Sequence, residues 1–206
     1  LGEPVLDDAS LSRFNGLATL PARLGGLGLQ NAVRCSPGAF WGAWADGIHM
    51  LHQRRPLEAA QLTALLNGNV RGSAGCVAAA EMAGRVLDQE GFQRPAWTEL
   101  RAGFRPTQRR QPGEEGELGE WRHGWQFFAC SLRNHIFRDQ TLLPQSTAPQ
   151  QALLRSGSGS HAAAWLHTLT TCRGTRMWAE HLQTALCRCL RLPLNLHGRT
   201  CEHDGH

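Results

Sequence analysis

Residues 20–29 read LPARLGGLGL, and this stretch sets how the segments on either side of it are joined. Glycine tolerates positive φ angles and close backbone approach, so Gly25, Gly26 and Gly28 predict a compact irregular loop. We expect its leucines to point inward, because so apolar a run on the surface promotes association. Arg23 lies among them, and an unpaired buried charge is costly. Its guanidinium is therefore expected to be partly buried and bonded, and Arg23→Ala to be destabilising.

On both sides of this loop, apolar residues recur at the spacing of one helix face. Ser36 and Pro37 have the residue types of an N-cap and a first helical position. Two stripes are strong: Trp41, Trp44, Ala45, Ile48 and Leu51, and then Trp121, Trp125, Phe128, Leu132 and Ile136. The sequence therefore predicts a mainly α fold, an irregular multi-helix bundle with a buried Gly/Leu-rich loop and a long polar loop.

One segment interrupts the helical pattern. Residues 104–120 are polar, rich in proline and glycine, and nearly free of apolar residues, which is typical of a linker or an exposed loop. We therefore predict an N-terminal helical part at 1–103, a C-terminal basic helical part at 121–200, and a short Cys/His tail at 201–206.

Positive charge is unevenly distributed along the chain. All 21 basic residues are arginine, whose planar fork suits phosphate groups and stacks on bases. Residues 1–103 balance nine arginines with nine acidic residues, whereas residues 121–206 carry nine arginines, four acidic residues and eight of the ten histidines. If RNA or DNA is a partner, it is expected to contact the C-terminal part of the chain. The alternative is that this part is a basic face exposed only to solvent. The predicted contacts are the arginines that lie off the apolar stripes: Arg122, Arg133, Arg138, Arg188, Arg191 and Arg199.

The densest group of metal-ligand types lies at the C-terminal end. Cys201, His203 and His206 are three zinc-donor types within six residues, but a structural zinc site needs four ligands. Zinc is therefore a possible cofactor, and an unmetallated tail is the alternative.

Catalytic signatures are missing from the sequence, so no catalytic residue is predicted. The chain has no Gly-x-Ser-x-Gly elbow, no cysteine-protease signature and no clustered carboxylates for two-metal chemistry. Its seven cysteines are scattered, as expected of reduced thiols. Neither a bilayer-long apolar run nor a secretory leader is present, so we expect an intracellular protein, nuclear or cytoplasmic, with no membrane partner.

Several blocks occur in an order that resembles a known family. The chain is similar to the segment that follows the polymerase domain in reverse-transcriptase polyproteins of non-LTR retrotransposons, of the kind abundant in dinoflagellates and other protists. The blocks are residues 20–29, AFWGAWAD at 39–46, GEWRHGWQ at 119–126, QALLRS at 151–156, AWL at 164–166 and LRLPL at 190–194.

The resemblance implies a non-catalytic segment of a polyprotein whose other part is an RNA-directed DNA polymerase. Such a segment would help to hold template RNA or target DNA, and would lead into a zinc-knuckle-like element at residues 201–206. Two other interpretations stay open. One is a domesticated helical scaffold that binds protein through its tryptophan-bearing faces, and the other is a hydrolase that uses Cys and His.

Overall fold

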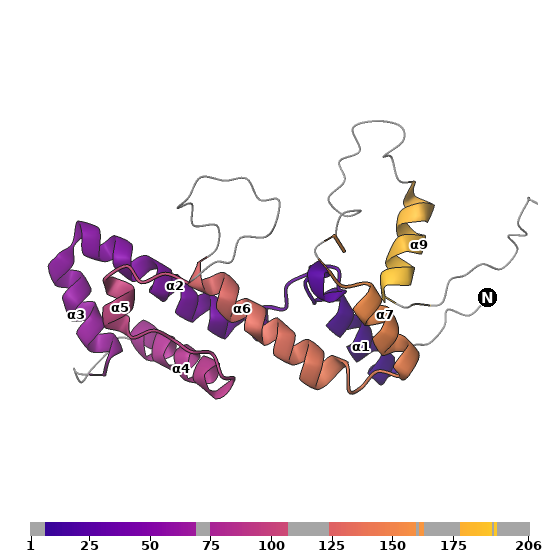
Figure 1. Cartoon of the computed structure of the whole chain (residues 1–206), viewed down its shortest axis with the longest axis horizontal. Coiled ribbons are helices and arrows are strands. Elements are labelled where there is room, and N and C mark those ends of the chain that lie inside the picture. Colours follow the sequence, from indigo (N-terminus) through magenta and orange to yellow (C-terminus); the bar gives the residue numbers. More distant parts are fainter. Residues whose placement is uncertain are drawn as a thin grey trace, which may run out of the picture. The chain divides into compact units, whose positions relative to one another are not determined.

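The computed structural model describes residues 7–68, 75–106, 124–159, 161–162, 178–190 and 192 (Figure 1). These residues form helices and their connections, with no strand among them, which confirms the predicted mainly α class. None of the described helices is both long enough and apolar enough to span a bilayer.

The chain divides into two compact units. The first unit comprises Leu1–Gln30 and Leu142–His206, and the second comprises Asn31–Thr141. The predicted boundary at 104–120 falls inside the second unit, because helices from both sides of it pack together. Residues 107–120 of that segment lie outside the described residues.

The first unit holds helix α1 (Asp8–Ala18), the 3₁₀ turn η1 (Ala22–Leu24), α7 (Ala148–Ser156) and α9 (Ala179–Leu190). The second unit holds α2 (Ala32–Arg54), α3 (Pro56–Leu66), α4 (Gly75–Gln89), α5 (Trp97–Arg101) and α6 (Trp125–Ile136). A π-helical segment, η2 (Phe137–Leu142), follows α6 directly and reaches the boundary between the units.

The Gly/Leu loop forms part of the core of the first unit. Leu20 and Leu24 are buried, as predicted. Gly25 has a φ of 89°, and a Cβ at this position would lie 2.7 Å from Leu154 Cδ1 on α7. Gly26 has no room for a Cβ, which would meet the backbone of the turn before it. The three glycines of the loop are therefore required for shape, Gly28 through its φ of 80°.

Two expectations for this loop were wrong. Leu29 is 59% exposed, because the chain has left the loop there and is approaching α2. Arg23 is also exposed, since the 3₁₀ turn directs Leu24 inward and leaves the residue before it on the outer side. The carbonyl oxygen of Arg23 accepts a hydrogen bond from Gly159 N at 2.9 Å.

The core of the second unit is built around Trp41. Its side chain is fully buried, and its ring centroid lies 5.5–6.1 Å from those of Phe92, Trp97 and Trp125, mostly in edge-to-face contact. Such pairs add to the apolar burial that already dominates core stability. Helices α2 to α6 all contribute to the other buried apolar residues: Ala45, Ile48, Leu66, Val77, Ala80, Ala83, Leu87, Leu100 and Ala129.

Helices α2 and α6 approach each other closely because α2 presents glycine at the contact. A Cβ on Gly38 would lie 2.9 Å from the backbone nitrogen of Cys130, and one on Gly42 would lie 2.5 Å from that of Gln126. Real Cβ atoms are not found that close to backbone, so only glycine fits. The spacing of one turn between the two glycines lines them up along a single face of α2.

Helix α2 begins one turn earlier than predicted. Its N-cap is Asn31, whose side chain accepts a hydrogen bond from Arg34 N at 2.9 Å. Pro37 therefore lies inside the helix, where it has no N–H to donate to the carbonyl of Val33. Ser36 Oγ donates to that carbonyl instead, at 3.2 Å. This compensation explains why the expected Ser36 cap was wrong.

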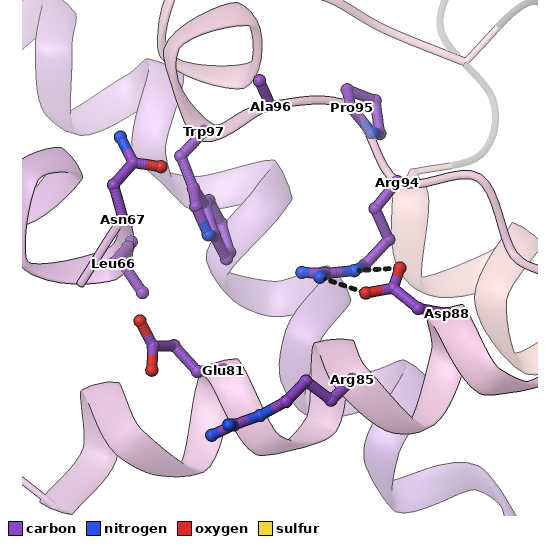
Figure 2. Close-up of a pocket in the computed structure, with 9 residues that line it drawn as sticks. All are labelled: Leu66, Asn67, Glu81, Arg85, Asp88, Arg94, Pro95, Ala96 and Trp97. Carbon is purple, nitrogen blue, oxygen red and sulfur yellow. Dashed lines mark hydrogen bonds and ion pairs between the residues drawn. The ribbon is translucent and has the colours of Figure 1, made fainter.

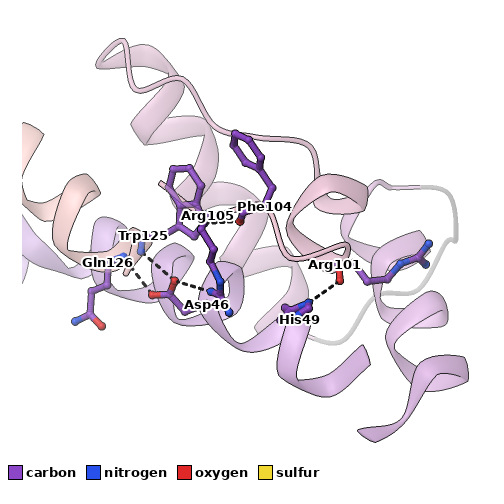
Figure 3. Close-up of polar contacts among 7 residues, drawn as sticks. All are labelled: Asp46, His49, Arg101, Phe104, Arg105, Trp125 and Gln126. Carbon is purple, nitrogen blue, oxygen red and sulfur yellow. Dashed lines mark hydrogen bonds and ion pairs between the residues drawn. The ribbon is translucent and has the colours of Figure 1, made fainter. Parts of the chain in front are cut away.

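Polar side chains of α2 fix the start of α6 and the end of α5 (Figure 3). Asp46 accepts hydrogen bonds from Trp125 N at 3.0 Å and Gln126 N at 3.5 Å, and thus caps α6 from a different helix. Arg105 lies 3.7 Å from the same carboxylate. His49 Nδ1 lies 3.2 Å from the carbonyl oxygen of Arg101, so it bonds the last turn of α5.

Gly42→Ala is expected to destabilise the second unit by about 1–3 kcal/mol, the usual cost of overpacking, because the new methyl group meets the backbone of Gln126. The matched control is Gly47→Ala on the same helix, where a Cβ meets nothing within 4 Å. That control should be neutral or stabilising by about 0.5–1 kcal/mol. Urea denaturation followed by tryptophan fluorescence measures both. Equal effects of the two variants would contradict the close α2–α6 contact.

Asp46→Ala is expected to lower the free energy of unfolding by about 1–2 kcal/mol, because the N–H groups of Trp125 and Gln126 lose their acceptor. Asp46→Asn keeps a side-chain acceptor and should lose less. Chemical denaturation ranks the two variants against the parent protein. An alanine variant as stable as the parent would show that α6 does not depend on this cap.

Candidate nucleic-acid interface

Three of the six predicted phosphate contacts lie in the described part of the chain: Arg133, Arg138 and Arg188. The other three, and the possible zinc ligands, lie outside the described residues: Arg122, Arg191, Arg199, Cys201, His203 and His206. Among described residues, no group of three or more His, Cys, Asp or Glu side chains is placed to hold a metal ion.

Arg133 does not face solvent, and that expectation was wrong. Its side chain is only 15% exposed, and its Nη2 lies 3.2 Å from Glu90 Oε1. Arg133 follows Trp125 and Ala129 at intervals of four, so it continues the buried stripe of α6. The sequence already contains this signal, but the charge of arginine argues against a core-facing position.

Arg34 lies near α6 and was not among the arginines predicted from the sequence. It lies in the first turn of α2, where its Nε donates to Asn134 Oδ1 at 2.8 Å. Its guanidinium carbon lies 4.3 Å from the ring centroid of Phe137, a close cation–π contact. Burial lowers the pKa of Arg34 from its ordinary value, and the positive charge of Arg133 lowers it further. Two arginines from different helices therefore lie within electrostatic reach of each other.

Arg138 lies on the π-helical turn that follows α6. It makes two hydrogen bonds to Asp139, at 2.7 and 3.3 Å, and its side chain is 25% exposed. π-helical turns are rare and occur frequently at functional sites. We call Arg34, Arg133, Phe137 and Arg138 the α6 basic cluster.

Two arginines of the α6 basic cluster lie beside carboxylates, Arg133 beside Glu90 and Arg138 beside Asp139. Guanidinium groups beside an aromatic ring combine the two contacts that nucleic acids accept, a fork for phosphate and a face for stacking. Charge reversal of Arg133 is a poor test of this surface, because a glutamate there would face Glu90 in a half-buried position.

Arg188, the third described arginine of the prediction, belongs to the first unit. It lies in the last turn of α9 and is exposed, as expected. A positive charge near a helix C-terminus is favoured by the helix dipole, which is a structural reason for its position.

A polar pocket of about 540 Å³ lies beside α4 in the second unit (Figure 2). Arg94 and Asp88 form a two-bond ion pair in it, at 2.7 and 2.5 Å, and the bonds from Arg94 lower the pKa of Asp88. Glu81 and Arg85 on α4 also line it, with Trp97 on the opposite side. Among the described lining residues there is no Ser, Thr, Cys or His.

The thiol of Cys130 on α6 is not activated. Burial raises the pKa of Cys130 to about 11, with Cys35 beside it adding to the shift. Its Sγ donates to the carbonyl oxygen of Cys35 at 3.5 Å. The thiolate is the reactive form, so this environment is the opposite of what a catalytic cysteine needs.

The chain matches no protein-family model, no curated protein and no solved structure. The resemblance to retrotransposon polyproteins is therefore a hypothesis that depends on the blocks quoted from the sequence.

Native Cys130 is expected to resist alkylation, because at pH 8 almost none of it is thiolate when its pKa is about 11. The exposed Cys76 provides the internal comparison. Iodoacetamide labelling followed by peptide mass spectrometry should modify Cys76 first, and labelling of Cys130 should rise only as pH approaches 11. Equal rates at pH 8 would show that Cys130 is not held as the neutral thiol.

Proposed function

We propose that this chain is a helical, non-catalytic segment that binds RNA or DNA beside an RNA-directed DNA polymerase in a retroelement polyprotein. The α6 basic cluster carries the proposal. In it, Arg34 of α2 contacts Asn134 and Phe137, which neighbour Arg133 and Arg138 in sequence on α6 and η2. The ordered blocks that resemble such polyproteins, and the arginine excess of residues 121–206, point in the same direction.

Binding of this kind would depend on phosphate and be tolerant of sequence. Arginine contacts to phosphate oxygens position a nucleic acid without reading its bases. Stacking on an aromatic ring is equally tolerant, because every base has a π face. The expected ligand is therefore a structured or single-stranded nucleic acid recognised by charge and shape.

One observation favours the second candidate, a protein-interaction scaffold. Helices α2 and α3 frame an apolar groove of about 280 Å³, lined by Ala43, Trp44, Gly47, Ile48, Leu51 and Leu62. Exposed apolar grooves mark interaction sites in many proteins. A partner seated there would bind by apolar burial, so its affinity would respond little to salt.

Salt dependence separates the two candidates. In a gel-shift assay with a structured RNA, three phosphate contacts, one for each arginine of the α6 basic cluster, predict a loss of affinity of roughly 40-fold between about 50 and 200 mM salt. Arg138→Gln should reduce the slope of log affinity against log salt by about one. The matched control is Arg55→Gln, which removes an arginine that is likewise ion-paired to a nearby acid, Glu58, but lies far along α2 from the cluster.

Failure of the parent protein to bind RNA or DNA at low salt would overturn the proposed function. Equal slopes for the two arginine variants would remove the α6 basic cluster from the binding surface.

A further inference from the structure

The ion pair between Arg133 and Glu90 has fewer bonds than the pair between Arg94 and Asp88. Arginine and carboxylate usually form two parallel hydrogen bonds, as Arg94 and Asp88 do in the same unit. Arg133 instead reaches Glu90 through one pair of atoms, Nη2 and Oε1, at 3.2 Å. Both side chains are mostly buried, so water does not supply the hydrogen bonds that the pair lacks.

Several polar atoms of this pair have no partner in the described part of the chain. Nε and Nη1 of Arg133 and Oε2 of Glu90 are buried without a hydrogen bond. Buried donors without acceptors cost free energy, and a single carboxylate oxygen cannot serve the three edges of one guanidinium. Arg133 therefore has donors to spare for a larger oxyanion.

A second positive charge lies beside these donors. Arg34 reaches α6 at Asn134, the residue after Arg133, through a hydrogen bond of 2.8 Å, and its guanidinium carbon lies 4.3 Å from the ring centroid of Phe137. Burial lowers the pKa of Arg34, and the positive charge of Arg133 lowers it further. A phosphate dianion carries more negative charge than the single carboxylate of Glu90, so it is favoured beside these two guanidinium groups.

We propose that Arg133 and Arg34 form a phosphate-binding site, and that Glu90 occupies Arg133 until a phosphate displaces it. A phosphate group offers several acceptor oxygens and matches the arginine fork. The phosphate has only one contact to Glu90 to replace, and the side chain of Arg133 is 15% exposed, so part of it already reaches solvent. We take the phosphate to come from the backbone of RNA or DNA, and this part of the inference rests on the proposed function.

The first arm of the test uses inorganic phosphate and the whole chain. The Nε–Hε resonance of Arg133, identified by its absence in Arg133→Lys, is followed by NMR during a phosphate titration at constant ionic strength. Glu90→Gln should bind phosphate about fivefold more tightly than the parent, because the carboxylate that competes for Arg133 is removed. The matched control is Glu58→Gln, which removes the same charge and breaks the surface ion pair with Arg55. It should not change the affinity.

The second arm repeats the comparison of Glu90→Gln with Glu58→Gln in the RNA gel-shift assay. Tighter RNA binding by Glu90→Gln alone identifies the nucleic-acid backbone as the source of the phosphate. A response to inorganic phosphate without any RNA binding would overturn the proposed function and leave the phosphate site standing. If the two variants bind RNA equally but differ in their response to inorganic phosphate, the phosphate does not come from the nucleic-acid backbone.

An unmoved Arg133 resonance in the parent protein, or identical phosphate affinities of the two glutamate variants, would overturn the phosphate site itself. Circular dichroism checks that Glu90→Gln is folded. Should this variant unfold, Arg34→Gln decides the question, because the parent response to phosphate should then be lost. A response that persists in Arg34→Gln would contradict the pairing of the two arginines.

Discussion

The close contact between α2 and α6 is the constraint on which the second unit depends. Gly38 and Gly42 bring the two backbones within reach of each other, and Trp41, between them in sequence, fills the space that the contact encloses. Asp46, one turn further along α2, caps the N-terminus of α6, the helix that packs against the two glycines. A single face of α2 thus supplies the close approach, the central ring of the core and the acceptor for the partner helix.

Hydrophobic spacing was sufficient to predict the fold class and the apolar stripe of α2, whereas on α6, among the described residues of the predicted stripe, only Trp125 is buried. Trp41, Ala45 and Ile48 are buried together because burial of large apolar groups outweighs local preferences. Helix boundaries were less predictable where side chains act on distant backbone. Nothing near Trp125 in the sequence indicates that its N–H is capped by Asp46, 79 residues away. The start of α2 was misplaced for a local reason, the hydroxyl of Ser36 that compensates for Pro37.

Among the residues proposed for function, sequence reasoning identified the arginine-rich region but not the geometry within it. The π-helical turn after Ile136 shifts which residues share a face, and a period of 3.6 residues does not anticipate it. Arg34 was missed because it is 100 positions from Asn134, its partner on α6. Net charge also overstates the free positive charge of this region, since Arg133 and Arg138 each face a carboxylate. Counting charges along the sequence cannot distinguish paired arginines from available ones.

The order of the chain has a consequence for its synthesis. The bond between Asp46 and Trp125 joins positions 79 residues apart, and translation proceeds at about 5–20 residues per second, so roughly 4–16 seconds separate their emergence. Throughout that interval Trp41, Ala45 and Ile48 have left the ribosome while α6, one of the helices that cover them, has not. The nascent chain therefore presents the part of α2 that α6 will cover for seconds, which makes this face one that a ribosome-associated chaperone would bind.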